Sequence, residues 1–339
     1  VLSERFETLR NPANWNNEIG LPMTLLRLRP EHEAAVLEMG LYTTGEIALL
    51  ANLARPRIGV VTAVRGVHLS RAGSIEAIET GKRELVEALP PDGWAILNAD
   101  DERVRRMADH TPARVLTYGF AEDAHVRASE VVSLGADGMR FTLHIDDDRF
   151  PVSTPVLGRH GVHNALAAVA VAVCARMDPA DIITGLARPL TMPQRSQLVH
   201  AGSWTILDDS YNASPDAVLA ALGLLAELPG RHFAVLGEML ELGDTTEAEH
   251  RRVGRRAAAL VDRLVVVGEG ARGIAEGALQ HGLDDSAVHL AADRDEALTQ
   301  LLAELRDGDT VLVKASRGAA LDLLVEQLVA EAAAGEPPA

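Results

Sequence analysis

The chain contains only two lysines, Lys82 and Lys314, against thirty arginines. A GC-rich genome would favour arginine, but it does not explain which two positions remain lysine. The amine of lysine can lose its proton near neutral pH and attack carbon, and its ammonium is a compact point charge, whereas a guanidinium does neither. These two positions are therefore the first candidates for a chemical role.

Lys82 belongs to a candidate cluster with Glu38 and His68. Glu38 ends a predicted strand, His68 follows the next strand by a few residues, and Lys82 lies on the helix after it. An acid and an imidazole at two strand ends could share a divalent metal. Each residue alone is more typical of an ordinary structural or surface position, so only their combination suggests a site.

Two further loops carry charge at predicted strand ends. The segment 207–216 reads Leu-Asp-Asp-Ser-Tyr-Asn-Ala-Ser-Pro-Asp, and 314–318 reads Lys-Ala-Ser-Arg-Gly. The first places two carboxylates before a helix N-terminus, which suits ribose hydroxyls, magnesium or a carboxylate ligand. The second places two cations at a helix start, which suits an anion. A capped turn and a solvated helix entry remain open alternatives.

The composition of the chain excludes some classes of binding partner. The net charge of −17 argues against nucleic acid or an anionic membrane surface, and no apolar run reaches the length of a membrane span. The single cysteine, Cys174, cannot form an internal disulfide, which fits a reducing, cytoplasmic location. A monomer binding small molecules is the expectation.

The length of 339 residues predicts two domains, and we expect the boundary at 190/191, because Pro189 and Pro193 interrupt the pattern there. Residues 1–190 mix helices and strands, with Ser74 capping a helix of 74–89. Strands are predicted at 34–37, 58–61, 94–97, 115–118, 128–134 and 139–145, the first two of buried type, and helices at 161–177 and 179–187.

Residues 191–339 repeat a β–α unit five times, which predicts an α/β, parallel, doubly wound sheet of Rossmann-like type. Strands are expected at 205–207, 233–236, 264–267, 287–290 and 310–313. Helices are expected at 214–228, capped by Ser214, and at 246–260, 271–281, 294–305 and 319–331. From these residues alone, the chain is a two-domain protein that binds a nucleotide or a carboxylated ligand.

Many ordered segments resemble the Mur ligase family, over essentially all 339 residues. Within that family, three stretches resemble the branch that joins D-alanyl-D-alanine to UDP-N-acetylmuramoyl-tripeptide. They are Asn16–Pro22, Asp208–Asp216, and Leu236–Gly243 with His250. Segments similar to the wider family are Leu37–Gly40, His68, Lys82, Leu97–Asp101, Asn164–Leu166, Arg195 and Lys314–Gly318.

The resemblance implies an ATP-dependent peptide ligase of peptidoglycan precursor synthesis that works through an acyl phosphate. It implies a central ATPase-type domain with a partial parallel-sheet core, and a C-terminal Rossmann-like domain. Lys82 matches a lysine that family members carbamylate with carbon dioxide, and Glu38, His68 and Lys82 match magnesium ligands.

Other roles are carried over by position. Asn164 matches an adenine-side asparagine, Arg195 a residue near the nucleotide phosphates and Asp209 a nucleotide contact. Lys82, His68 and Arg195 are the candidate catalytic residues. The candidate substrate-binding residues are Asn17, Asn212, Ser214 and Lys314.

The chain departs from the family pattern at several points, including Gly161 in place of a common second asparagine and Ala315 in the Lys-Gly-Ser-Arg loop. No GxxxxGK[ST] phosphate-binding loop is present, and Thr62–Arg65 reads Thr-Ala-Val-Arg where relatives have Thr-Asn-Val-Gly. We therefore expect a fragment that lacks the N-terminal domain and this loop, and that does not turn over as it stands. The alternatives are a non-catalytic Mur-like binding module and a related amide ligase with another carboxylate substrate.

Overall fold

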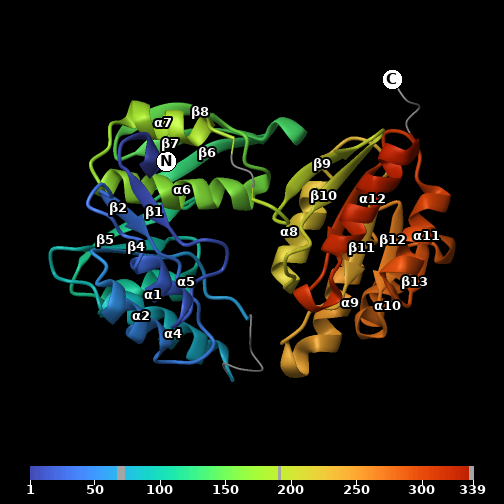
Figure 1. Ribbon diagram of the computed structural model, residues 1–339, viewed down its shortest axis with the longest axis horizontal. Helices are drawn as coiled ribbons and strands as arrows, with labels where there is room; N and C mark the ends of the chain where they lie inside the picture. The colour runs from blue at the N-terminus through green and yellow to red at the C-terminus, as the bar shows by residue number, and fades with distance from the viewer. Residues whose placement is uncertain (67–72, 190–191, 336–339) are drawn as a thin grey trace. The chain divides into compact units, whose positions relative to one another are not determined.

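The computed structural model describes residues 1–66, 73–189 and 192–335, so His68 lies outside the described residues. The chain forms two compact units (Figure 1). The first is Val1–Leu134 with Gly138–Pro189, and the second is Leu190–Ala339 with the short turn Gly135–Asp137 (η3). The division falls after Pro189, one residue from the predicted boundary.

The first unit alternates helices and strands up to β5 and then runs through three consecutive strands. Its elements are η1 Leu2–Glu4, β1 Thr8–Arg10, α1 Gly20–Leu25, β2 Ala34–Val36, α2 Glu46–Ala54, β3 Ile58–Val61, α4 Ile75–Glu87, β4 Trp94–Asn98, α5 Glu102–Arg105, η2 Arg106–His110, β5 Arg114–Gly119, β6 Val126–Ser133, β7 Met139–Ile145, β8 Asp148–Thr154, α6 Gly158–Cys174 and α7 Pro179–Ala187.

The main sheet of this unit has the order β3-β4-β5-β6-β7-β8, parallel from β3 to β6 and antiparallel from β6 to β8. The expected parallel core is present, and the β7–β8 hairpin extends it. Helix α6 covers one face, and its buried residues such as Leu166 pack with Phe141 and Leu143 of β7. β1 and β2 form a separate parallel pair. The strand predicted at 34–37 is present as β2, but the prediction that it is buried is wrong, because Val36 is 49 % exposed.

Local sequence explains the helix starts. Ser74 accepts a hydrogen bond from the backbone N–H of Ala77 (3.2 Å), which confirms the predicted cap of α4. Asp178 accepts one from the N–H of Ala180 (2.8 Å), with Pro179 at the first position of α7. Both caps fix helices that pack on the sheet.

The second unit has one sheet of order β13-β12-β11-β14-β10-β9. The five predicted strands are parallel and connected by helices, as a Rossmann-like fold requires. The elements are β9 Gln197–Ala201, β10 Trp204–Asp208, α8 Pro215–Leu225, β11 His232–Gly237, η4 Gly243–Thr245, α9 Thr246–Ala257, β12 Arg263–Val267, η5 Glu269–Ala271, α10 Arg272–Gln280, η6 Asp285–Ala287, β13 Val288–Ala291, α11 Arg294–Glu304, β14 Thr310–Lys314, η7 Arg317–Ala319 and α12 Asp322–Gly335.

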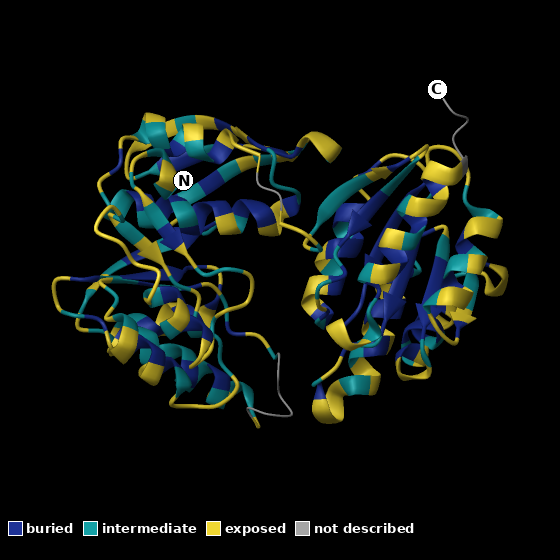
Figure 2. Cartoon of the chain, viewed as in Figure 1, coloured by how far each residue is buried: buried dark blue, intermediate teal, exposed yellow. Residues whose placement is uncertain are grey.

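The strands of this sheet are mostly buried, whereas its helices alternate buried and exposed residues (Figure 2). That pattern is expected of a parallel sheet covered on both faces. The edge strand β9, which pairs antiparallel with β10, was not predicted. No helix in the described part of the chain is both long and apolar enough to span a membrane.

The end of α6 carries an arginine in a conformation that favours glycine. Arg176 has φ +58°, and the N–H groups of Arg176 and Met177 donate to the carbonyls of Val173 and Ala172, which is a Schellman cap. A left-handed conformation costs a residue with a Cβ about 1–2 kcal/mol.

We therefore expect Arg176→Gly to stabilise the protein by about 0.5–1 kcal/mol, after the greater entropy of glycine in the unfolded chain is subtracted. Urea unfolding followed by circular dichroism measures the change. Arg176→Ala is the matched control, since it keeps the Cβ and should show no gain. An equal gain in both variants would assign the effect to the lost guanidinium instead.

Candidate functional site

In the first unit, the turn after β4 joins the carboxyl ends of neighbouring strands. The side-chain amide of Asn98 donates to the carbonyl of Thr62 (2.7 Å), and its oxygen accepts from the N–H of Asp100 (2.8 Å). Thr62 follows β3, so one buried amide links the ends of β3 and β4. The loops where ligands bind in parallel sheets are thereby fixed to each other.

Asp101 is the most heavily used carboxylate of this edge, and it is only 5 % exposed. One of its oxygens accepts from the N–H of Val64 (2.9 Å) and from the guanidinium of Arg65 (2.6 Å). The other accepts from the N–H of Arg103 (3.0 Å) at the start of α5. Asp101 thus holds the 62–65 segment in place, including the guanidinium of Arg65.

Because these bonds satisfy a buried charge, we expect Asp101→Asn to destabilise the protein by about 2 kcal/mol. Urea unfolding midpoints would measure the loss. The control is Asp92→Asn, since Asp92 forms an exposed pair with Arg57 and should change stability little. Equal effects of both substitutions would contradict the role assigned to Asp101.

Lys82 lies on α4, and its ammonium donates to the carbonyl of Ala63 (2.6 Å). Burial lowers the pKa of Lys82; Asp101 counteracts this shift and Arg65 adds to it. A lowered pKa makes the neutral amine more accessible than in an ordinary lysine. The backbone carbonyl of Ala63 and the charge of Arg65 therefore both act on this amine.

Asp100 connects the same turn to α6. Its carboxylate accepts from the N–H groups of Phe120 (2.7 Å) and Ala121 (2.9 Å) and lies 3.1 Å from Nε2 of His163. Burial lowers the pKa of His163, and the neighbouring Asp100 opposes that shift. Asn164, the next residue on α6, is exposed.

The predicted metal ligands are only partly described. Glu38 is exposed, its Oε1 accepts from the amide of Asn16 (2.8 Å), and its backbone N–H donates to Asn11 (2.7 Å). A Cβ at Gly81, beside Lys82, would lie 2.7 Å from Leu41, so α4 approaches the segment that follows Glu38. Within the described residues, no group of three His, Cys, Asp or Glu side chains could hold a metal.

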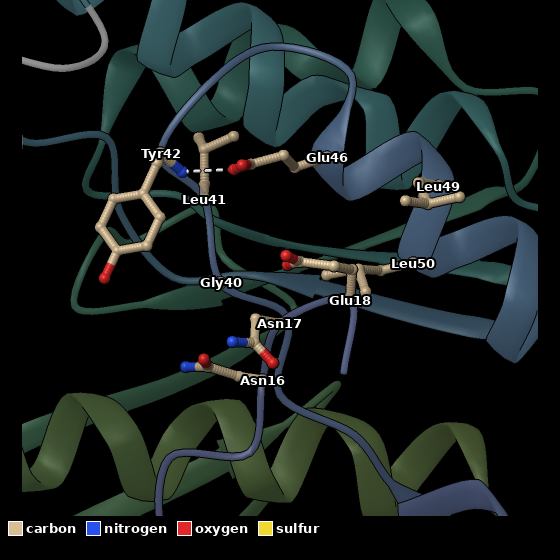
Figure 3. Close-up of a pocket in the computed structure, with 9 residues that line it drawn as sticks. All are labelled: Asn16, Asn17, Glu18, Gly40, Leu41, Tyr42, Glu46, Leu49 and Leu50. Carbon is tan, nitrogen blue, oxygen red and sulfur yellow. Dashed lines mark hydrogen bonds between the residues drawn. The ribbon is translucent and has the colours of Figure 1, made fainter. Parts of the chain in front are cut away.

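A small cavity of about 170 Å³ lies beside Gly40 (Figure 3). Asn17 lines it, and the side-chain oxygen of Asn17 accepts from the N–H groups of Gly20 (2.8 Å) and Ile19 (3.2 Å) at the start of α1. The cavity is lined by Asn16, Asn17, Glu18, Gly40, Leu41, Tyr42, Glu46, Leu49 and Leu50. Asn17 therefore both orders the helix and borders a space that could receive a ligand group.

In the second unit, Lys314 and Asp209 form a buried ion pair at the ends of β14 and β10. The ammonium lies 2.6 Å from Oδ2 of Asp209, and it donates to the carbonyl of Asn212 (2.8 Å). Lys314 is 3 % exposed, and burial lowers its pKa, while Asp209 opposes the shift. Its ammonium is thus engaged within the protein and orders the 209–212 loop.

The neighbouring candidates differ in exposure. Asn212 is exposed, and its side-chain oxygen accepts from the N–H of Ala213 (2.9 Å). Ser214 stands before α8 with Pro215 at the first position, as predicted, but its side chain makes no capping hydrogen bond, so that part of the prediction is wrong. The hydroxyl of Ser214 is not committed to the helix.

Ser316 connects three loops at this edge. Its hydroxyl accepts from the N–H of Leu240 (2.9 Å) and lies 3.5 Å from the carbonyl of Ala213, while its backbone N–H donates to the carbonyl of Glu238 (3.0 Å). The loops after β10, β11 and β14 are therefore held together by one buried serine.

Arg195 is exposed, and its guanidinium carbon lies 4.2 Å from the ring centroid of Tyr211. Arg317 approaches the same ring at 5.2 Å. The backbone N–H of Tyr211 donates to the carbonyl of Gln194 (3.1 Å), beside Arg195. Neither Tyr211 nor Asp101 was predicted as a site residue, although both stand inside stretches that resemble the family.

Family models match both units. Residues 2–172 match the Mur ligase middle domain, and residues 194–317 match the Mur ligase, glutamate ligase domain. Similar curated proteins carry the name UDP-N-acetylmuramoyl-tripeptide–D-alanyl-D-alanine ligase. The one from Mycobacterium tuberculosis is 42 % identical over 99 % of this chain and 70 % of its own length. The one from Escherichia coli is 36 % identical over 97 % of this chain and 72 % of its own length.

Solved structures with a similar fold carry names from the same family. A MurF structure from Acinetobacter baumannii superposes with a TM-score of 0.89 at 29 % identity, covering 97 % of this chain and 72 % of that one. MurF ligase from Thermotoga maritima, solved in complex with ADP, gives a TM-score of 0.87 at 26 % identity, covering 99 % and 76 %.

Proposed function

The chain belongs to the Mur ligase family, and we propose that it performs the reaction for which its curated relatives are named. It is an ATP-dependent peptide ligase of peptidoglycan precursor synthesis that joins D-alanyl-D-alanine to UDP-N-acetylmuramoyl-tripeptide. The observation that carries this conclusion is the 42 % identity over 99 % of the chain. Both the Asn98–Asp101 turn and the Lys314–Asp209 loop lie inside the matched regions.

The chemistry proceeds in two steps. The terminal carboxylate of the tripeptide takes the γ-phosphoryl group of ATP, which gives an acyl phosphate and ADP. The amine of D-alanyl-D-alanine then attacks the acyl carbon, inorganic phosphate leaves and the amine loses a proton. Phosphoryl transfer depends on positioning and on neutralising charge, which anchored loops and cationic side chains can provide.

We propose that the amine of Lys82 takes up carbon dioxide and releases a proton, becoming a carbamate. Its lowered pKa supports this reaction, because only the neutral amine attacks carbon dioxide. With Glu38 and His68, the carbamate would hold a magnesium ion, which when bound would supply positive charge to the phosphates. The exposure of Glu38 and the approach of α4 to Leu41 support this grouping.

We also propose roles for the nucleotide-side residues. Asn164 would contact the adenine from the exposed side of α6, and Arg195 would contact phosphate. Both carboxylate oxygens of Asp209 are engaged, one by Lys314 and one by the N–H of Ser196 (2.9 Å). Asp209 would therefore act on the nucleotide by positioning the segment that carries Arg195.

Asn17, Asn212 and Ser214 would bind substrate through side-chain groups at exposed or partly exposed positions. Lys314 would contribute by ordering the loop that carries Asn212. A cytoplasmic location and a monomeric state remain predictions, which fractionation and light scattering would test.

The proposed function predicts that the protein, as its gene encodes it, releases phosphate only when ATP, UDP-N-acetylmuramoyl-tripeptide and D-alanyl-D-alanine are all present. A coupled phosphate assay with mass spectrometry of the pentapeptide product measures this. Omitting each substrate in turn is the control. Efficient turnover with a different amine or carboxylate, and none with these substrates, would favour a related amide ligase instead.

A further inference from the structure

Two exposed guanidiniums lie against one tyrosine ring in the second unit. The guanidinium carbons of Arg195 and Arg317 are 4.2 Å and 5.2 Å from the ring centroid of Tyr211. Each cation is attracted by the ring, but the two cations repel each other. Among the ion pairs of the described residues, none joins either guanidinium to a carboxylate.

The surroundings of this pair fix its position. The N–H of Tyr211 donates to Gln194 (3.1 Å), next to Arg195, and Arg317 follows Ser316, whose hydroxyl and N–H are anchored to the loop after β11. The nearby Lys314 cannot serve an outside anion in the same way, because Asp209 holds its ammonium at 2.6 Å. Arg195 and Arg317 are thus two cations, within the described part of this unit, that remain available to a ligand.

We propose that Tyr211 is a positioning residue that holds Arg195 and Arg317 as a paired clamp for an oxyanion of the reactants. This inference rests on the proposed function, which supplies two such oxyanions: the carboxylate of the incoming dipeptide and the phosphoryl oxygens of the nucleotide. Guanidiniums bind both through paired N–H donors. A local clamp is needed because the whole chain carries a net charge of −17, which repels anions.

Titrations of this chain followed through the Nε–H NMR signals of the two arginines test the clamp. The probes are D-alanyl-D-alanine, the same dipeptide with its carboxylate converted to an amide, ADP and inorganic phosphate. Arg195→Gln and Arg317→Gln assign the signals. We expect both arginine signals to move together with at least one oxyanion probe.

The probes separate the two sources. A response to the dipeptide but not to its amide supports the clamp with a carboxylate ligand, and a response to ADP or phosphate alone supports it with a phosphoryl ligand. Arginine signals that stay unmoved by every probe, in a folded wild-type chain, would overturn the inference.

Two variants test the role of the ring. Tyr211→Phe keeps the aromatic face and should bind like the wild type, whereas Tyr211→Leu should weaken oxyanion binding about tenfold. Thermal melting checks that both variants fold. If Tyr211→Leu does not fold, Arg317→Gln replaces it in the test, because it alters an exposed side chain and should weaken oxyanion binding by a similar factor. Unchanged affinity in the folded Leu variant, or in Arg317→Gln, would overturn the clamp and leave the ligase function standing. A failed ligation assay alongside intact clamp binding would overturn the function instead.

Discussion

Replacement of Lys82 by arginine is expected to reduce ligation by about 10³-fold although the charge is kept, which is the scale of losing one preorganised electrostatic group. A guanidinium cannot form a carbamate, and it is too large for the partly buried position where the ammonium lies 2.6 Å from the carbonyl of Ala63. Steady-state phosphate release by the protein as its gene encodes it measures the effect.

The neighbouring position provides the control for this prediction. Arg83→Lys makes the reverse exchange at the next residue, whose guanidinium pairs with Glu87 on the same helix, and activity should not change. Bicarbonate should not rescue Lys82→Arg. Carbon-13 NMR of the wild-type chain with labelled bicarbonate should show a carbamate signal that the variant lacks. Turnover near the wild-type rate in Lys82→Arg would remove the carbamate from the mechanism.

The sequence predicted the second unit well because its signal is local. Each buried strand is a short apolar run, and each helix shows apolar residues at helical spacing. The five parallel strands could therefore be located without knowing their partners in the sheet. The antiparallel strand β9 was missed, although Gly202-Ser203 joins it to β10 as a two-residue hairpin with φ +54° at Gly202. The glycine of that turn is a sequence signal for a hairpin, whereas the nearby prolines at 189 and 193 indicate a break in the regular pattern.

The candidate site was predictable only in outline. Because ligands bind beyond the carboxyl ends of parallel strands, the loops after β10 and β14 could be chosen from the sequence. The burial of these side chains and their pairing could not be predicted from the sequence. Lys314 and Asp209 are 105 residues apart, and their contact depends on the tertiary fold. The same holds for Asp101, whose bond to Val64 spans 37 residues.

Loss of the ion pair between Lys314 and Asp209, at the ends of β14 and β10, has the largest expected effect on stability. We expect Asp209→Asn to destabilise the second unit by about 3–5 kcal/mol, because it leaves the ammonium of Lys314 buried without a counter-charge. Lys314→Met should cost less, since Asp209 is closer to solvent. Urea unfolding, followed by a probe within residues 192–335, measures each change.

The double variant Asp209→Asn/Lys314→Met decides whether the cost comes from the unpaired charge. If it does, removing the ammonium as well should recover much of the loss. The double variant should then lose clearly less free energy of unfolding than the two single variants lose together. Glu247→Gln is the matched control, because Glu247 and Arg251 form an exposed pair one helical turn apart and stability should change little. Additive effects at 209 and 314 would mean that each side chain is held by its backbone partners alone, and that the ion pair does not organise this edge of the sheet.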